Sequence, residues 1–210
     1  MKVQVQVVDH PLVRHSLAQL RDRHTPPELF RSLTRRVTTL LVIEATRSLR
    51  TRRQPVETPL ETVQAELLDE HLVVVPILRA GLGMLDAAVD LFPDISVSVG
   101  YLGLERDEET AEASIYYSKL PPIEGRTVLL VDPMLATGGS ACHALSGIFA
   151  HQPKRVILAC IVAAPEGISA VNQQFPQAQI FTAALDRELD SRKYILPGLG
   201  DFGDRLYGTI

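Results

Sequence analysis

A short stretch in the middle of the chain carries residue types that can hold a sugar phosphate. An apolar run, residues 129–131, ends at one carboxylate, Asp132, and a loop of small residues follows. The last four residues of this loop are Thr137, Gly138, Gly139 and Ser140. A helix is expected to begin there, and its unpaired N–H groups and positive dipole end suit one phosphate group. Asp132 can accept hydrogen bonds from vicinal hydroxyls, so the pattern predicts a ribose 5-phosphate site. A tight turn with a helix-capping Ser or Thr remains the alternative.

Two familiar motifs do not fit this loop. A P-loop needs a lysine directly before its Ser or Thr, whereas Gly139 precedes Ser140 here. The serine elbow of the α/β-hydrolases needs G-x-S-x-G directly after a strand. Cys142 stands where the second glycine of that motif belongs, and a whole loop separates Ser140 from the strand end. Neither interpretation is kept.

The elements that must position this loop alternate regularly from residue 72 onward. Strands are predicted at residues 72–78, 95–102, 126–132, 155–164 and 179–185, and helices at 81–92, 139–150 and 166–175. Several of the strands are nearly continuous Val/Ile/Leu runs, which is typical of strands buried on both faces. The alternation predicts an α/β fold with an open, mainly parallel five-stranded sheet flanked by helices. Ligands bind beyond the carboxyl ends of such strands.

The remaining segments are expected to be additions to a single domain, 1–210. Residues 3–7 alternate like a strand, and an amphipathic helix is predicted after Pro11. Residues 25–28 have the form of a capping box for a second helix that runs towards Leu49, and two prolines then break the pattern in 51–61. We expect an N-terminal helical part at about 1–60, a lid or hairpin at about 103–120 and a ligand-binding tail at about 185–210.

Composition limits the classes of function. The 210 residues carry a formal charge of −4, so a basic footprint for nucleic acid is not expected. No apolar run reaches membrane-spanning length, and the N-terminus alternates like a strand instead of resembling a signal peptide, so a cytoplasmic location is expected. Cys142 and Cys160 are predicted to be small buried hydrophobic residues. The histidines show no spacing typical of a metal site, and no protein metal ligand is predicted.

Five stretches together resemble the uracil phosphoribosyltransferase family. They are HPLVRHSLAQLRD (10–22), VVPILRAGLGM (74–84), VDPMLATGGS (131–140), VAAPEGI (162–168) and YILPGLGDFGDRLYGT (194–209). The resemblance covers almost the whole chain. It implies a phosphoribosyltransferase-like fold and transfer of ribose 5-phosphate from phosphoribosyl diphosphate (PRPP) to N1 of uracil, giving UMP and diphosphate in pyrimidine salvage. It also implies Mg²⁺ bound as Mg–PRPP, a homodimer or homotetramer, and GTP as an effector.

The resemblance also implies the site residues. The PRPP site would consist of Arg79, Arg106, Asp132, Pro133, Met134, Leu135, Ala136, Thr137, Gly138, Gly139, Ser140 and Asp201, and the uracil site of Ile195, Gly200, Asp201 and Phe202. Asp132 and Asp201 would be catalytic. Guanidinium groups at Arg79 and Arg106 suit the leaving diphosphate, because they are fixed bidentate donors. Asp201 would stabilise the ribosyl cation or help to deprotonate N1, and these two roles stay open, as does a simple turn-capping role.

Two departures and two rival functions complete the interpretation. Pro133 follows Asp132, where many phosphoribosyltransferases carry a second acid, and this implies that Mg²⁺ is held mainly by PRPP. Phe202 stands where many bacterial members have alanine, so its ring would narrow the base pocket or pack on the lid. The rivals are a pyrimidine-nucleotide-sensing regulator that binds RNA, and a catalytically silent homologue of the same fold.

Overall fold

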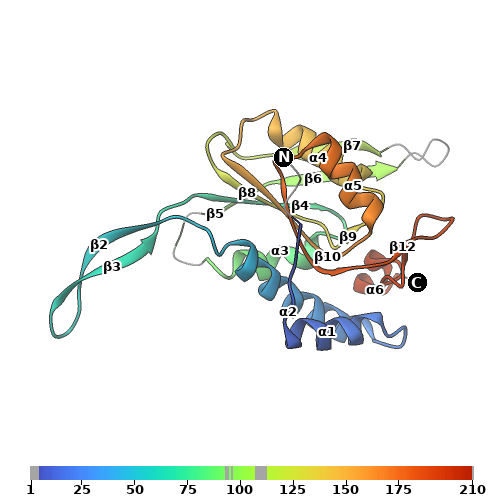
Figure 1. Cartoon of the computed structure of the whole chain (residues 1–210), viewed down its shortest axis with the longest axis horizontal. Helices are drawn as coiled ribbons and strands as arrows, with labels where there is room; N and C mark the ends of the chain where they lie inside the picture. Colours follow the sequence, from blue (N-terminus) through green and yellow to red (C-terminus); the bar gives the residue numbers. More distant parts are fainter. Residues whose placement is uncertain (1–4, 93–94, 96, 107–112, 210) are drawn as a thin grey trace.

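The computed structural model describes residues 5–92, 95, 97–106 and 113–209; the side chains at positions 105–106 and 113–115 lie outside this description. Its centre is a parallel sheet of buried aliphatic strands: β4 (Leu72–Leu78), β8 (Thr127–Val131), β10 (Arg155–Ala163) and β11 (Gln179–Leu185). Within the described chain the sheet follows the order β1-β11-β10-β8-β4-β6-β7 (Figure 1). The predicted open, mainly parallel sheet is therefore confirmed.

The sheet is larger than the five strands that the sequence predicts. The short strands β1 (Val5–Val7) and β9 (Met134–Leu135) pair in parallel with β11 and β10. The predicted strand 95–102 is divided into β5 (Val97–Val99) and β6 (Tyr101–Arg106), which both pair with β4. β7 (Ala113–Lys119) then pairs antiparallel with β6, so the expected hairpin segment extends the sheet edge. The prediction of five strands was thus too low, because short and edge strands carry little hydrophobic pattern.

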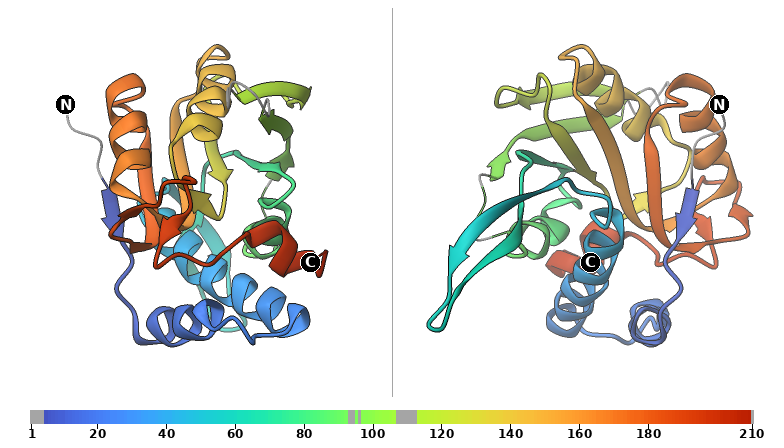
Figure 2. Two further views of the ribbon diagram at one scale, coloured as in Figure 1. Left: turned by 90° about the vertical axis from the view of Figure 1, so that its right-hand side faces the viewer. Right: turned by 60° about the vertical axis from the view of Figure 1, so that its left-hand side comes forward.

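Helices cover both faces of the sheet, as expected. On one face lie α4 (Gly139–Phe149) and α5 (Pro165–Gln174), which come from the predicted crossovers. On the other face lie α1 (Pro11–Arg21), α2 (Pro27–Ala45), α3 (Leu82–Val89) and the C-terminal α6 (Phe202–Tyr207) (Figures 1 and 2). Two short strands, β12 (Glu188–Leu189) and β13 (Ile195–Leu196), pair with each other before α6. The two sheet faces bury separate aliphatic clusters.

The start and end of α2 differ from the prediction. Its N-cap is Pro26 and no side chain caps it, while the Thr25 hydroxyl donates to the Gln19 carbonyl at 2.6 Å. The capping box that residues 25–28 suggest is therefore not formed, and this part of the prediction was wrong. The helix ends at Ala45, four residues before Leu49, because Thr46 is the C-cap and its hydroxyl donates to the Val42 carbonyl at 2.6 Å.

A long β-hairpin replaces the end of the predicted helical part. Strands β2 (Thr51–Glu57) and β3 (Thr62–Leu68) pair antiparallel along their whole length and project from the body at the left of Figure 1. The boundary near residue 60 was therefore wrong, since residues 51–57 are a strand. We call residues 51–68 the β-arm. Pro55 is compatible with it, because the arm has only two strands and both of them are edges.

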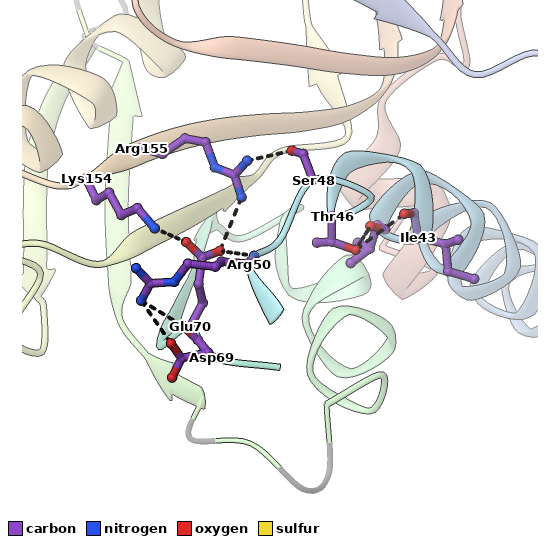
Figure 3. A network of polar contacts seen from close by, with 9 residues as sticks. Ile43, Thr46, Ser48, Arg50, Asp69, Glu70, Lys154 and Arg155 are labelled. Atoms are coloured by element: carbon purple, nitrogen blue, oxygen red, sulfur yellow. Dashed lines mark hydrogen bonds and ion pairs between the residues drawn. The ribbon is translucent and has the colours of Figure 1, made fainter. Parts of the chain in front are cut away.

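Ion pairs hold the base of the β-arm against the body. Arg50 pairs with Asp69 at 3.3 Å, Lys154 forms a close ion pair with Glu70, and Arg155 lies 3.6 Å from Glu70 (Figure 3). Burial alone would raise the pKa of Glu70. The hydrogen bonds from Lys154 and from the Arg50 backbone N–H, together with the charges of Lys154 and Arg155, outweigh that effect and hold its pKa below the usual value. The carboxylate form is therefore favoured at the arm base.

Both cysteines are buried, as predicted. Burial raises the pKa of Cys160 to about 12, and it also raises the pKa of Cys142. Both side chains are therefore held as neutral thiols at neutral pH and pack as small hydrophobic groups. None of the described helices is long and apolar enough to cross a membrane.

Candidate active site

Asp132 lies at the carboxyl end of β8, in the middle of the sheet. Its backbone N–H donates to the Ala159 carbonyl of β10 at 3.2 Å, and its Oδ1 accepts from the Met134 N–H at 3.4 Å. The next residues form β9, which is seated against Val162 and Ala163 of β10. The carboxylate thus stands at the end of a buried strand, and its loop is fixed by the neighbouring strand.

The loop reaches the start of α4 through a left-handed residue. Gly138 has φ 84° and is the N-cap of α4, which begins at Gly139 as the sequence predicts. The Gly139 N–H contacts the Thr137 hydroxyl at 3.4 Å. A Cβ at Gly138 would lie 2.9 Å from Ala170 Cβ and 3.0 Å from the Gly167 carbonyl, so this position needs glycine for both conformation and space. The N-terminal amides of α4 therefore lie at the end of the loop that begins at Asp132.

Gly167 supports this loop from behind. A Cβ at Gly167 would lie 2.5 Å from the Ala136 carbonyl oxygen and 2.8 Å from that of Leu135. The Ala164 N–H donates to the same Leu135 carbonyl at 2.9 Å. The VAAPEGI stretch therefore lets the first turn of α5 approach the loop backbone directly. The sequence showed this stretch only as part of a resemblance, and its packing role required the structure.

Arg79 directly follows β4, the neighbour of β8. The Leu78–Arg79 peptide is cis, the Arg79 side chain is exposed, and its carbonyl accepts from the Tyr207 hydroxyl at 3.1 Å. The turn after it is tightly seated, because a Cβ at Gly81 would lie 2.6 Å from both the Ile77 and the Val131 carbonyls. Arg79 is thus placed on the same sheet edge as Asp132, and the C-terminal helix bonds its backbone.

Arg106 can be placed only by its backbone. It is the last residue of β6, opposite Ala113 of β7. Its side chain and residues 107–112 of the expected lid lie outside the described residues. The assignment of Arg106 to PRPP therefore stays a prediction.

A cleft of about 320 Å³ joins the loop to the C-terminal tail. The predicted residues that line it are Met134, Ala136, Ile195, Gly200, Asp201 and Phe202. Ala80, next to Arg79, also lines it, so segments from three parts of the chain meet there. The cleft is also lined by Arg192, Lys193 and Tyr194, which were not predicted, because nothing in their spacing distinguishes them from surface residues.

Two residues of the cleft have further contacts. Asp201 is the N-cap of α6, and its Oδ1 accepts from the Asp204 N–H at 2.9 Å, so the turn-capping role is present. Phe202 is buried, and its ring packs edge-on against Phe30 of α2 with the centroids 5.0 Å apart. The ring thus packs on α2, and Phe202 also lines the cleft.

The strand order, the loop after β8 and the cleft at the carboxyl edge define a phosphoribosyltransferase fold. A hypoxanthine-guanine phosphoribosyltransferase from Bacillus anthracis superposes with a TM-score of 0.52 at 12% identity, over 76% of this chain and 80% of that one. At that identity the likeness concerns the fold alone. A protein from Aquifex aeolicus superposes with a TM-score of 0.92 at 40% identity, over 97% and 98% of the two chains.

Sequence comparison then gives the family. The family model for uracil phosphoribosyltransferase matches residues 7–209. The uracil phosphoribosyltransferase of Dictyoglomus thermophilum is 49% identical over 97% of this chain and 98% of its own length, and that of Thermosipho africanus is 48% identical over 99% and 100%. This chain belongs to the uracil phosphoribosyltransferase family.

Proposed function

We propose that this chain transfers ribose 5-phosphate from PRPP to N1 of uracil, giving UMP and diphosphate in pyrimidine salvage. The observation that carries this proposal is that Met134 and Ala136, from the loop after β8, line the same cleft as Ile195 and Gly200 of the tail. A donor sugar and an acceptor base must meet within bonding distance, and this cleft is where the two predicted half-sites adjoin. Family membership supports the same activity.

The sugar phosphate is assigned to the loop after β8. The first-turn amides of α4, with Thr137 to Ser140, would surround the 5-phosphate, as fits the positive end of a helix dipole. The remaining loop positions, Pro133 to Ala136, would follow the ribose. Asp132 would accept hydrogen bonds from the ribose hydroxyls, and its charge would strengthen them. Arg79 and Arg106 would bind the diphosphate.

The proposed chemistry depends mainly on positioning and charge. Negative charge accumulates on the leaving diphosphate as the C1–O bond breaks, and fixed guanidinium groups stabilise it. The ribose becomes cation-like, and Asp132 and Asp201 would lie near it as carboxylates. Uracil N1 would then attack from the opposite face and invert C1, and the N1 proton would pass to Asp201 or to solvent as the new bond forms. Holding both substrates in one cleft supplies the orientation that this step needs.

Mg²⁺ is proposed to arrive with PRPP. Over the described residues no group of three His, Cys, Asp or Glu side chains could hold a metal ion, and Pro133 follows Asp132 where a second acid would be needed for a carboxylate pair. A single acid at this position fits a metal ion that is held mainly by the substrate. The ion would neutralise part of the diphosphate charge.

Cytosine is expected to be a very poor substrate. Uracil presents two carbonyl acceptors and an N3–H donor, which the backbone groups around Ile195 and Gly200 would pair with. Cytosine reverses two of these partners, and a buried mismatch can lower kcat/KM by as much as about 10⁴-fold. Product formation from labelled uracil and labelled cytosine, with PRPP and Mg²⁺, measures this ratio. Comparable turnover of both bases would contradict the base-site assignment.

The same assay separates the two rival functions. A catalytically silent homologue would give no UMP. An RNA-binding regulator would bind RNA tightly and lose that binding with salt, because phosphate contacts depend on counterion release. The formal charge of −4 favours neither RNA binding nor a basic regulatory surface. A cytoplasmic location, with no nucleic-acid or membrane partner, is part of the proposal.

The β-arm is proposed to contact another subunit in a homodimer or homotetramer. An isolated two-stranded hairpin is marginally stable in water, yet this one projects from the body and exposes apolar side chains. These are Leu60, Val63, Leu67 and Leu68, and Leu60 at the tip is 96% exposed. Burial against a second copy would remove this apolar surface from water.

Shortening the β-arm is expected to lower the oligomeric state. Residues 53–66 would be replaced by an Asn-Gly turn, which favours a tight hairpin and leaves the ion pairs at the arm base intact. Sedimentation velocity should then show a smaller particle with unchanged circular dichroism. A particle of the original size would exclude the arm from the interface, and a monomeric parent protein would refute the oligomer.

GTP is proposed as an effector, as the family resemblance implies. Sedimentation velocity and UMP formation, each measured with and without GTP, test this proposal.

A further inference from the structure

A buried carboxylate, Asp186, lies directly behind the tail segment that forms the base side of the cleft. Asp186 follows β11 and is 6% exposed. Its two oxygens accept from Arg21 Nη1 at 2.9 Å, from Arg21 Nη2 at 2.6 Å and from the Gly198 N–H at 2.9 Å. Three segments that are distant in sequence, the end of α1, the end of β11 and the tail, therefore meet at one carboxylate.

Arg21 bonds the tail backbone as well as the carboxylate. Its Nη1 also donates to the Gly198 carbonyl at 2.8 Å. Gly198 is thus held at both its N–H and its carbonyl, by a bidentate ion pair that fixes the position and the rotation of the guanidinium plane. Lysine could not reproduce this arrangement, because its ammonium is a single point without a planar fork.

The held residue controls the geometry of the base segment. Gly198 has φ 61°, and a Cβ there would lie 2.0 Å from the Ile195 carbonyl oxygen, so the turn between Ile195 and Gly198 is closed as tightly as glycine permits. Ile195 comes directly before this turn and Gly200 two residues after Gly198, and both line the cleft. A shift at Gly198 would therefore move backbone groups on both sides of the base position.

A second arginine fixes the next carbonyl. Arg205 of α6 donates from Nη1 to the Leu199 carbonyl at 2.8 Å and to the Leu20 carbonyl at 2.6 Å, and from Nη2 to the Asp22 carbonyl at 2.6 Å. The carbonyls of residues 198 and 199 are thus bonded from outside the cleft by two guanidinium groups. The end of α1 takes part in both arrangements, which gives the HPLVRHSLAQLRD stretch a physical role.

We propose that the Arg21–Asp186 pair positions the uracil-binding backbone and thereby sets the affinity and selectivity for the base. Neither residue lines the cleft, so both act through Gly198 and are positioning residues. Removing Arg21 leaves a buried carboxylate with one backbone donor, and such a group must draw in water or move. Either change loosens the turn that carries Ile195 and Gly200. This inference rests on the proposed function.

The kinetic test compares Arg21→Met with Arg21→Lys. Arg21→Met keeps the apolar stem and removes the fork, and it is expected to raise the KM for uracil by about 10- to 100-fold, since small misplacements of positioning groups cost this much. The KM for PRPP is expected to rise less than that for uracil, because Asp201 is the only proposed PRPP residue in the loosened segment, and the preference for uracil over cytosine should fall. Arg21→Lys should give an intermediate uracil KM.

Two control variants on the same helix separate positioning from stability. Val13→Ala removes fully buried side-chain atoms of α1, lowers the melting temperature and should leave the KM for uracil unchanged. Arg14→Met removes an exposed arginine that pairs with Asp9. It should change neither the melting temperature nor the KM. A normal uracil KM in Arg21→Met, or an equal rise in Val13→Ala, would overturn the proposal.

Hydrogen exchange supplies a measurement that does not depend on activity. In Arg21→Met the amides of residues 195–202 should exchange at least about tenfold faster than in the parent protein, because the local opening of this turn becomes easier. Those in the sheet strands β4 and β8 should not change. Unchanged exchange in 195–202 refutes the positioning role even if no UMP forms. An inactive parent protein whose Arg21→Met variant shows the faster exchange would refute the enzyme function alone.

Discussion

Replacing Gly167 with alanine is expected to remove most of the activity, although the residue has no proposed contact with substrate. The added Cβ would lie 2.5 Å from the Ala136 carbonyl oxygen and 2.8 Å from that of Leu135, and both are backbone atoms of the loop between β8 and α4. A side chain could rotate away, but backbone cannot, so either α5 or the loop must shift. Such a shift would misplace the donors for PRPP and lower kcat/KM for PRPP by about 10²-fold or more. Overpacking should also cost about 1–3 kcal/mol of stability.

Gly147→Ala is the matched control for this prediction. Gly147 lies inside α4, and a Cβ there would meet no atom within 4 Å. Alanine is a better helix former than glycine, so this variant should gain about 0.5–1 kcal/mol of stability and keep its activity. Steady-state kinetics with varied PRPP and thermal unfolding of both variants provide the comparison. Normal PRPP kinetics in Gly167→Ala would show that the loop tolerates the shift and that the close approach is not needed for function.

The sequence was sufficient for the centre of this fold because the relevant signals are local. The central strands β4, β8 and β10 are nearly continuous apolar runs rich in Val, Ile and Leu, and this pattern predicts their burial on both faces. Asp132 could be placed at a strand end because the apolar run stops there. The helix after Gly138 could be predicted for a similar reason, since the glycines of the loop break the strand pattern directly before it.

The β-arm could not be predicted in the same way. β2 carries mostly Arg, Gln and Glu, and only Val63, Ala65 and Leu67 of β3 alternate with polar residues, so the apolar pattern is too short to separate the arm from a loop. Pro55 lies within β2 and argues against a strand in any central position, although it is allowed at an edge. The pairing of its strands depends on backbone hydrogen bonds and on ion pairs at the base, and neither kind of contact can be recognised from residue types along the sequence.

The parts of the site that depend on distant contacts were equally hidden. Asp186 and Arg21 are 165 positions apart, and as single residues each is typical of a solvated surface. Gly167 matters only because α5 returns to within contact distance of Leu135 and Ala136. Residue types could indicate which chemistry the loop performs, but they could not indicate which other segments hold it in place.

Asp132→Asn is expected to keep the fold and to lower kcat/KM for PRPP by about 10- to 100-fold, because hydrogen bonds to a charged acceptor are worth about 1.5–3 kcal/mol. Asparagine has the same shape, and its Oδ1 can still accept from the Met134 N–H, which the carboxylate contacts at 3.4 Å. The change therefore removes charge while the loop keeps its local bond. Asp90→Asn is the control, because Asp90 is an exposed acid at the end of α3 that pairs with Arg35 at 3.5 Å.

The division of the Asp132→Asn effect between kcat and KM tells which state of the reaction the carboxylate stabilises. If Asp132 only holds the ribose hydroxyls of bound PRPP, the KM for PRPP should rise while kcat stays normal, because ground-state and transition-state binding weaken equally. If the charge of Asp132 also stabilises the cation-like ribose, its removal should lower kcat as well. Because the proposed function places the carboxylate beside the reacting sugar, we expect the second result. Unchanged values of both constants would exclude Asp132 from the site, and a rise confined to the KM for uracil would place it on the base side.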